Sequence, residues 1–288
     1  MNSIQLKAMG KINLGLDVMR RRPDGYHEVK MVMQMVNLYD RVGITVESQP
    51  GIRITSNLSF LPTNENNIVY KAAAMLMEEY AIERGVAISL EKHIPVAAGM
   101  AGGSTDAAAA LYGMNRLFSL GLGKKKLMEL GLRLGADVPY CIMRGTALSE
   151  GIGEVLTPLP AMPDCWILIA KPPVSVSTKF VYENLHLEKL HRHPDIDGIV
   201  KAIKDKDLEG MCQRLENVLE TVTAKKHPQI NAIKQFMAEH GAISALMSGS
   251  GPTVFGIFSD ERETRSASEA LRETGMARQV YVVKPFNP

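Results

Sequence analysis

The sequence lacks the features that would place the protein in a membrane, in a secretory route or on a nucleic acid. No apolar run approaches the roughly 18 residues that a membrane helix needs. The first residues carry a lysine where a secretion signal has its apolar core. With 33 Lys and Arg against 31 Asp and Glu, the net charge of +2 is too balanced to indicate nucleic acid. We therefore expect a cytoplasmic protein that binds neither a membrane nor a nucleic acid.

Cysteine is scarce, and internal repeats and low-complexity segments are absent. The three cysteines are odd in number and form no C-x-x-C pair, which predicts buried thiols and neither disulfides nor a zinc site: Cys141, Cys165 and Cys212. We expect no metal ion held by the protein alone. Hydrophobic residues make up 45% of the 288 residues, enough for packed cores, so we expect one large or two medium domains.

The segment from Ile94 to Leu111, IPVAAGMAGGSTDAAAAL, most strongly suggests chemistry. A proline ends an apolar run, a turn of small residues follows, and the alanines predict a helix. The first N–H groups of a helix have no partner inside it and the dipole is positive there, so this junction suits a phosphate. The glycines follow neither the Walker A nor the dinucleotide pattern. A plain tight turn, capped by Ser104, Thr105 or Asp106, is therefore an equal alternative.

Alternating apolar residues predict strands over residues 4–19, 29–36 and 40–54, with breaks at Gly43 and at Pro50–Gly51. In the first of these strands, Lys11 and Asn13 lie two apart and so share one face. The dipeptide Asp24–Gly25 after a proline predicts a turn before the next strand. Helices are expected over 67–84, where Gly85 would close the helix, over the alanine run to Leu117, and over 124–134.

A proline-rich segment near residue 160 predicts a boundary between domains 1–160 and 161–288. Beyond it, the pattern predicts a strand at 165–170, two strands around the glycine turn 248–253, and a last strand at 280–284. Helices are expected at 175–185, 196–203, 208–219, 229–239 and 263–273. This order of elements suggests an α+β domain of the ferredoxin-like type.

Three motifs stand in one order: GKINLGLDV, then PVAAGMAGGSTDAA, then LMSGSGPTVFG. Together they resemble the GHMP kinase superfamily over roughly the whole chain. Two further motifs, R-x-D-G-Y-H and G-A-D-V-P, resemble the members that phosphorylate a cytidine-diphosphate sugar alcohol in non-mevalonate isoprenoid biosynthesis. The resemblance implies an α+β, two-domain fold, with a ribosomal protein S5 domain 2-like N-terminal domain and a ferredoxin-like C-terminal domain. It also implies ATP as co-substrate, Mg²⁺ carried with ATP, and a monomer or weak homodimer.

The resemblance implies a role for each matching residue. Asp137 would take the proton from the attacking hydroxyl, and Lys11 would neutralise charge beside it. Tyr26 and Tyr182 would enclose the cytosine, with His27 at its edge. Further substrate contacts would come from Asn13, Thr178, Ser248 and Gly249. The ATP phosphates would lie along Pro95, Val96, Ala97, Ala98, Gly99, Met100, Ala101, Gly102, Gly103, Ser104 and Thr105.

Alanines stand at positions where this superfamily often has glycine, namely Ala97, Ala98 and Ala101. Their methyl groups limit how closely the backbone approaches a phosphate, so we expect ATP to bind along a slightly different loop path. Ordinary roles stay open too, because Asp137 is also a favoured N-cap type. Two other functions are weighed: a GHMP kinase for homoserine or mevalonate, which would need no aromatic base pocket, and a non-catalytic RNA-binding module, which would need a basic stripe.

Overall fold

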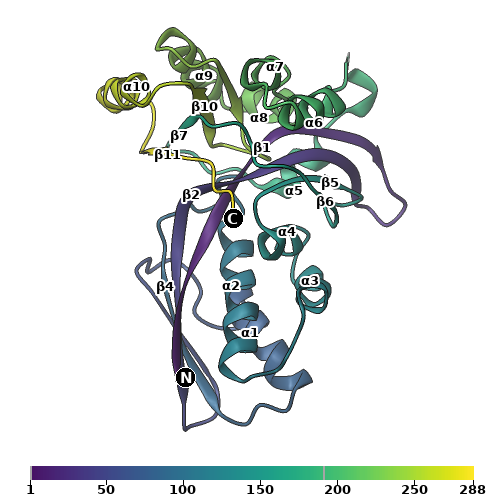
Figure 1. The fold of residues 1–288 in the computed structure, drawn as a ribbon, viewed down its shortest axis with the longest axis vertical. Coiled ribbons are helices and arrows are strands. Elements are labelled where there is room, and N and C mark those ends of the chain that lie inside the picture. Colours follow the sequence, from purple (N-terminus) through teal and green to yellow (C-terminus); the bar gives the residue numbers. More distant parts are fainter. Residues whose placement is uncertain (1, 191) are drawn as a thin grey trace. The chain divides into compact units, whose positions relative to one another are not determined.

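A computed structural model describes residues 2–190 and 192–288 of the chain. The chain divides into two compact units, and each is described by itself. The first contains the residues up to Gly10, 38–96 and 101–144, and the second contains 11–37, 97–100 and 145–288. Two long strands, β1 (Ser3–Arg21) and β2 (His27–Glu47), belong in part to each unit (Figure 1). The expected domain boundary near residue 160 stays a prediction.

The first unit packs helices against a small sheet. β4 (Gly85–Glu91) pairs antiparallel with the second half of β2 and parallel with β3 (Ile52–Ser56). α1 (Ile68–Glu79) packs against α2 (Gly102–Leu117) and β3, and α2 also contacts α3 and α4. The last two helices are α3 (Lys124–Leu132) and α4 (Val138–Met143). Apolar side chains from these elements fill the core of the unit, among them Ile44, Leu76, Ile88 and Leu111.

Two glycines in this unit do not act as predicted. Gly43 does not break the strand, because β2 continues through it and pairs Gly43 with Ser89 of β4. Gly85 does not close α1, which ends at Glu79 with Tyr80 as its C-cap, and it begins β4 instead. A Cβ at Gly85 would lie 2.1 Å from the carbonyl oxygen of Gln49. At both positions a neighbouring chain segment lies close to the glycine and leaves little room for a side chain. Local sequence patterns do not show such contacts.

The second unit contains a 4-stranded antiparallel sheet in the order β11-β7-β10-β9. The strands are β7 (Trp166–Lys171), β9 (Ser244–Met247), β10 (Val254–Phe258) and β11 (Gln279–Val283). α9 (Gln229–Glu239) and α10 (Glu261–Glu273) pack against this sheet (Figure 1). With α5 to α8 inserted after β7, the chain order is strand, helix, strand, strand, helix, strand. The predicted ferredoxin-like arrangement is confirmed.

The remaining elements of this unit include several that were not predicted. β5 (Thr146–Glu150) and β6 (Val155–Pro158) form a hairpin that the sequence analysis did not predict. The predicted helix 208–219 is wrong beyond Cys212, because α7 (Leu208–Cys212) ends there and β8 (Glu216–Asn217) pairs in parallel with β1. The other elements are α5 (Thr178–Glu183), a 3-10 helix (Leu187–Lys189), α6 (Ile196–Lys204) and α8 (Glu220–Lys226).

The cysteines confirm the expectation of buried thiols. All three are buried, and among the described residues none is in a disulfide. Burial raises the pKa of both Cys165 and Cys212 to about 12, so these thiols stay protonated at neutral pH. In the described part of the chain, no helix combines the length and apolar character required to cross a membrane.

Candidate functional site

The helix α2 begins with open N–H groups, as the glycine-rich segment predicts. Its N-cap is Ala101, and no side chain caps it. The first bonded amide is that of Thr105, which donates to the carbonyl oxygen of Ala101 at 2.9 Å. Within the described part of the first unit, the N–H groups of Gly102, Gly103 and Ser104 have no acceptor. This end of the helix can therefore receive an anion.

Capping by Ser104, Thr105 or Asp106 is a wrong prediction. All three residues lie inside α2, and the side chains of Thr105 and Asp106 are buried. The cap position falls to Ala101, with φ 55° and ψ 29°, and Ala97 also has a positive φ of 50°. Left-handed backbone is unusual for alanine and costs about 1–2 kcal/mol per residue. The alanines therefore adopt the conformation that glycine would take without this cost.

Gly99 brings the segment 97–100 against the turn formed by residues 248–252, and both segments belong to the second unit. The hydroxyl of Ser248 donates to the carbonyl oxygen of Gly99 at 2.9 Å. Gly99 has φ 72°, and a Cβ there would lie 2.1 Å from the carbonyl oxygen of Ser248. Only glycine fits this contact, so Gly99 joins the two predicted glycine-rich segments.

Lys11 and Asn13 share one face of β1, as their spacing predicts. The Lys11 ammonium donates to Oδ1 of Asn13 at 2.7 Å, and both side chains are buried. The Lys11 amide donates to the carbonyl oxygen of Met100 at 3.1 Å. A Cβ at Gly249 would lie 3.4 Å from Asn13 Oδ1. In the second unit the Lys11–Asn13 pair thus lies next to both glycine-rich segments, Lys11 through its backbone amide and Asn13 through its side chain.

The turn 248–252 is held by residues that the sequence did not single out. The buried Asn217 donates through Nδ2 to the carbonyl oxygens of Met247 and Gly249, each at 2.8 Å. Its Oδ1 accepts from the amide of Leu219 at 3.0 Å. The hydroxyl of Thr223 donates to the carbonyl oxygen of Ser250 at 3.1 Å. Asn217 lies in the stretch 208–219 that was predicted as a helix, and Thr223 lies outside every predicted element, so no local pattern pointed to either residue.

In the second unit the predicted substrate residues His27 and Tyr182 meet, and the predicted Thr178 meets Ser250 of the glycine turn. The ring centroids of His27 and Tyr182 lie 5.1 Å apart, and the hydroxyls of Thr178 and Ser250 are 2.8 Å apart. Burial, and secondarily the charge of Arg21, lowers the pKa of His27, so its ring is neutral at neutral pH. Tyr26 follows the confirmed Asp24–Gly25 turn and is 60% exposed. The aromatic rings can stack on a flat ligand, and the hydroxyl groups can form hydrogen bonds with it.

Asp137 lies in the first unit, at the N-cap of α4. It is half-buried, and its side chain does not cap the helix. Within the described part of its own unit, the carboxylate accepts no hydrogen bond and forms no ion pair. A carboxylate without a partner in its unit is available to accept a proton. The expected ion pair with Lys11 stays a prediction.

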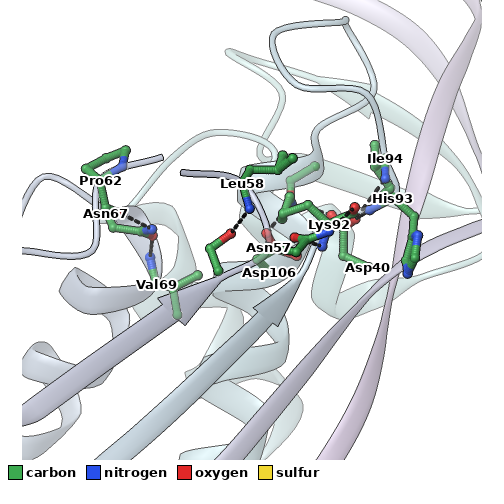
Figure 2. A network of polar contacts seen from close by, with 12 residues as sticks. Asp40, Asn57, Leu58, Pro62, Asn67, Val69, Lys92, His93, Ile94 and Asp106 are labelled. Atoms are coloured by element: carbon green, nitrogen blue, oxygen red, sulfur yellow. Dashed lines mark hydrogen bonds and ion pairs between the residues drawn. The ribbon is translucent and has the colours of Figure 1, made fainter. Parts of the chain in front are cut away.

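A further charged group of the first unit was missed. The ammonium of Lys92 bonds the carboxyl groups of both Asp40 and Asp106, and Figure 2 shows it between them. The Lys92 side chain is only 4% exposed. One signal was present: Asp40 lies between Leu38 and Val42 in the alternating pattern and so had to point inward, where a carboxylate needs a partner.

Burial dominates the protonation of this group. It raises the pKa of Asp106 to about 8; the charge of Lys92 opposes the rise, and the charge of Asp40 and a hydrogen bond with it add to the rise. For Lys92, burial lowers the pKa, but the two carboxyl groups outweigh it, so its pKa is raised. Lys92 therefore stays charged while Asp106 is the group that holds a proton at neutral pH.

Residues 67–145 match the family described as GHMP kinases N terminal domain, and residues 199–276 match GHMP kinases C terminal. The 4-diphosphocytidyl-2-C-methyl-D-erythritol kinase of Lachnospira eligens is 59% identical over 288 residues, which is 100% of both chains. The protein of the same name from Lachnoclostridium phytofermentans is 55% identical and covers 99% of this chain and 98% of its own.

A solved structure agrees with these relatives. The crystal structure of a 4-(cytidine 5'-diphospho)-2C-methyl-D-erythritol kinase superposes with a TM-score of 0.85 at 31% identity. It covers 99% of this chain and 100% of that chain. Both the fold and the sequence of this chain are therefore similar, end to end, to kinases of that name.

Proposed function

The chain belongs to the GHMP kinase family, beside its 4-diphosphocytidyl-2-C-methyl-D-erythritol kinases, and we propose that it phosphorylates 4-diphosphocytidyl-2-C-methyl-D-erythritol. The reaction moves the γ-phosphoryl group of ATP to a hydroxyl of the sugar alcohol and gives the 2-phosphate and ADP, in non-mevalonate isoprenoid biosynthesis. The observation that carries the proposal is the full-length identity of 59% with a kinase of that name. The setting is the cytoplasm, and the protein acts as a monomer or weak homodimer.

We place the ATP phosphates along Pro95 to Thr105. The open N–H groups at the start of α2 and the positive end of its dipole support this placement. Ala97 and Ala101, both with positive φ, shape the turn, and their methyl groups cannot cap the amides at the start of α2. Mg²⁺ arrives with ATP, because this ion usually binds through substrate phosphates with few protein groups. The hydroxyls of Ser104 and Thr105 are the groups of this segment that fit it.

We place the substrate along the second unit. The cytosine lies between the rings of Tyr26 and Tyr182, and His27, neutral at neutral pH, reads its edge. A neutral imidazole has both a donor and an acceptor, as this task requires. The rest of the substrate contacts the polar groups that line β1, α5 and the turn 248–252: Asn13, Thr178, Ser248 and Gly249.

In this proposal Asp137 is the general base and Lys11 the counter-charge. A sugar hydroxyl is a weak nucleophile until its proton leaves, and an unpaired carboxylate can take that proton. A buried ammonium stabilises the negative charge that develops on the attacking oxygen and on the phosphoryl group. Its hydrogen bond to Asn13 fixes where the Lys11 charge lies.

The substrate assignment is tested by ADP release. Purified protein is supplied with ATP and, in separate reactions, with 4-diphosphocytidyl-2-C-methyl-D-erythritol, homoserine or mevalonate. We expect turnover with the cytidine substrate alone, because only this molecule has a base for the aromatic groups to hold. Turnover with homoserine or mevalonate and none with the cytidine compound would refute the assignment.

The base assignment predicts a large loss in the Asp137→Asn variant. The amide keeps the shape of the side chain but cannot take a proton, so kcat should fall by about 10²–10⁴-fold. ATP affinity, measured by calorimetry, should stay within about twofold, because the phosphates bind elsewhere. Asp164→Asn, which changes an exposed carboxylate, is the matched control. A kcat near that of the control would show that Asp137 is not the base.

A further inference from the structure

The proposed base, Asp137, stands directly before a very short helix of the first unit. This helix, α4, contains 6 residues. A helix of this length is not stable alone in water, so packing against its neighbours decides where it lies. The Asp137 side chain neither caps α4 nor, within the described part of its own unit, accepts a hydrogen bond. The carboxylate is therefore placed only through the backbone that carries it.

The neighbouring helix α3 contacts α4 at both of its ends. The ammonium of Lys124, the first residue of α3, donates to the carbonyl oxygen of Met143, the last residue of α4, at 2.9 Å. At the opposite end, Val138, the first residue of α4, packs against Gly131 of α3. The position of α4, and of Asp137 before it, is thus set by α3.

The chain between the two helices is closed on itself. The amide of Gly135 donates to the carbonyl oxygen of Gly131, and the amide of Val138 donates to the carbonyl oxygen of Gly135, each at 3.1 Å. Asp137 lies inside this closed turn, between Gly135 and Val138. A shift of Val138 relative to Gly131 must therefore move the backbone of Asp137 as well.

Gly131 leaves no room for a side chain between the helices. A Cβ there would lie 2.8 Å from Cγ1 of Val138 and 3.1 Å from Cδ1 of Ile142. Val138 is fully buried, and its β-branched side chain has one strongly preferred rotamer in a helix, so its methyl group cannot turn aside. The Ile142 contact involves only the end of a longer side chain, which can rotate away. Added bulk at position 131 would therefore displace Val138 as a whole.

The conformation of α3 does not require a glycine at this position. Gly131 lies within the helix and does not have a positive φ. Alanine is the better helix former, because glycine loses more backbone entropy on folding. The close approach of Val138 is the feature of this site that alanine would not permit.

We propose that Gly131 is a positioning residue: its lack of a side chain lets Val138 lie close against α3, and this contact sets where the Asp137 carboxylate lies for proton transfer. The inference rests on the proposed function, because it needs Asp137 as the base. The carboxylate must lie within hydrogen-bond distance of the hydroxyl whose proton it takes, so a displacement of about 1 Å can lower kcat by about 10²-fold. The open amides at the start of α2 do not take part in this contact.

The test compares kcat for 4-diphosphocytidyl-2-C-methyl-D-erythritol in the wild type, Gly131→Ala, Val138→Ala and the double variant. Gly131→Ala pushes Val138 away from α3, whereas Val138→Ala removes the methyl groups that touch α3 and leaves Asp137 loosely placed. We expect each single variant to lower kcat by about 10–10²-fold. In the double variant only the Cβ of residue 138 remains, 3.4 Å from the new Cβ, so the contact is restored. Its kcat should return to within about fivefold of the wild type.

A matched control and a second readout separate this role from general packing. Gly123→Ala makes the same change at the N-cap of α3, where no atom lies within 4 Å of the Cβ position, and should leave kcat within about twofold of the wild type. The dissociation constant of ATP, measured by calorimetry, should stay within about twofold in every variant. A general loss of structure would weaken ATP binding together with kcat.

A further comparison connects the effect to Asp137. In the Asp137→Asn background the base is already lost, so adding Gly131→Ala should lower kcat by less than about threefold more. A further loss as large as the one in the wild-type background would overturn the proposal, because Gly131 would then act through another group.

The outcomes distinguish the two proposals. No turnover of the cytidine substrate by the wild type would refute the proposed function, and a fully active Asp137→Asn variant would refute the base and this inference with it. A Gly131→Ala variant as active as Gly123→Ala, or a double variant with a kcat no higher than that of Val138→Ala, would overturn the positioning role and leave the kinase assignment standing. The last comparison does not use the Gly131→Ala single variant, so it decides the question even if that protein fails to fold.

Discussion

The two glycine-rich turns of this chain have similar compositions but are held differently. At the start of α2, the amides of the first turn have no side-chain cap. In the turn 248–252, the amide of Ser248 donates to Thr253 and that of Gly251 to Ser248. Side chains from outside this turn also bond the carbonyl oxygens of Gly249 and Ser250, and that of Met247 just before it.

The difference shows what each turn does. A backbone whose groups are already bonded is held in one conformation and can present side chains, here the hydroxyls of Ser248 and Ser250. A backbone whose amides have no partner can donate them to a ligand. The unbonded amides lower the stability of the protein, and ligand binding raises it again. Counting glycines therefore does not separate a binding turn from a supporting one, whereas the side chains that hold the backbone do.

The largest effect is expected where the two segments meet, in Gly99→Ala. The new Cβ would lie 2.1 Å from the carbonyl oxygen of Ser248, at a residue with φ 72°. Overpacking and left-handed strain together should cost about 3 kcal/mol of unfolding free energy. Urea unfolding measures the loss. Gly123→Ala, at a glycine with φ −72° and no atom near its Cβ position, should change stability by less than about 1 kcal/mol.

A Gly99→Ala variant as stable as Gly123→Ala would mean that residues 97–100 and 248–252 do not touch in solution. The two turns would then not be joined through Gly99, and each would have to be considered separately. Kinetics on the same variant provide a second test. Displacement of residues 97–100 should raise the KM for ATP even in protein that remains folded.

The next effect comes from opening the closed turn, in Asn217→Ala. The change removes two donors from the carbonyl oxygens of Met247 and Gly249 and the acceptor of the Leu219 amide. Unpaired buried groups cost about 1–3 kcal/mol, so we expect a loss of about 2 kcal/mol by urea unfolding. Asn184→Ala, which removes an exposed amide bonded to Phe180, is the control and should cost less than about 0.5 kcal/mol. Equal losses in both variants would show that the turn does not depend on Asn217.

Local patterns predict those parts of the fold whose causes are local. Local apolar patterns give β1 and β10, and a period of two correctly places Lys11 and Asn13 side by side. The helix expected over 208–219 fails because Glu216 and Asn217 pair with β1, about 200 residues earlier in the chain. A parallel bridge of two residues leaves no periodic signal. Elements set by distant partners are therefore the ones that sequence reasoning misses.

The same distinction applies to the candidate site. The open start of α2 follows from glycines before a run of alanines, both of which act locally. Asp40 and Lys92 are 52 residues apart and meet only when β2 and β4 pair. Asp106 matched a cap residue in the sequence, yet burial beside Lys92 gives it a different environment. Side chains acquire such roles from three-dimensional neighbours, which one sequence does not specify.

The smallest effect tests the open turn itself, in Ala101→Gly. Alanine at φ 55° is strained by about 1–2 kcal/mol, and glycine relieves this strain while adding about 0.5–1 kcal/mol of unfolded-state entropy. The two contributions leave a net gain of about 0–1.5 kcal/mol. Urea unfolding should show this gain, whereas Ala108→Gly, in the middle of the same helix, should lose about 1 kcal/mol. If Ala101→Gly loses stability like Ala108→Gly, the helix starts before Ala101, and its first amides are not the open ones described above.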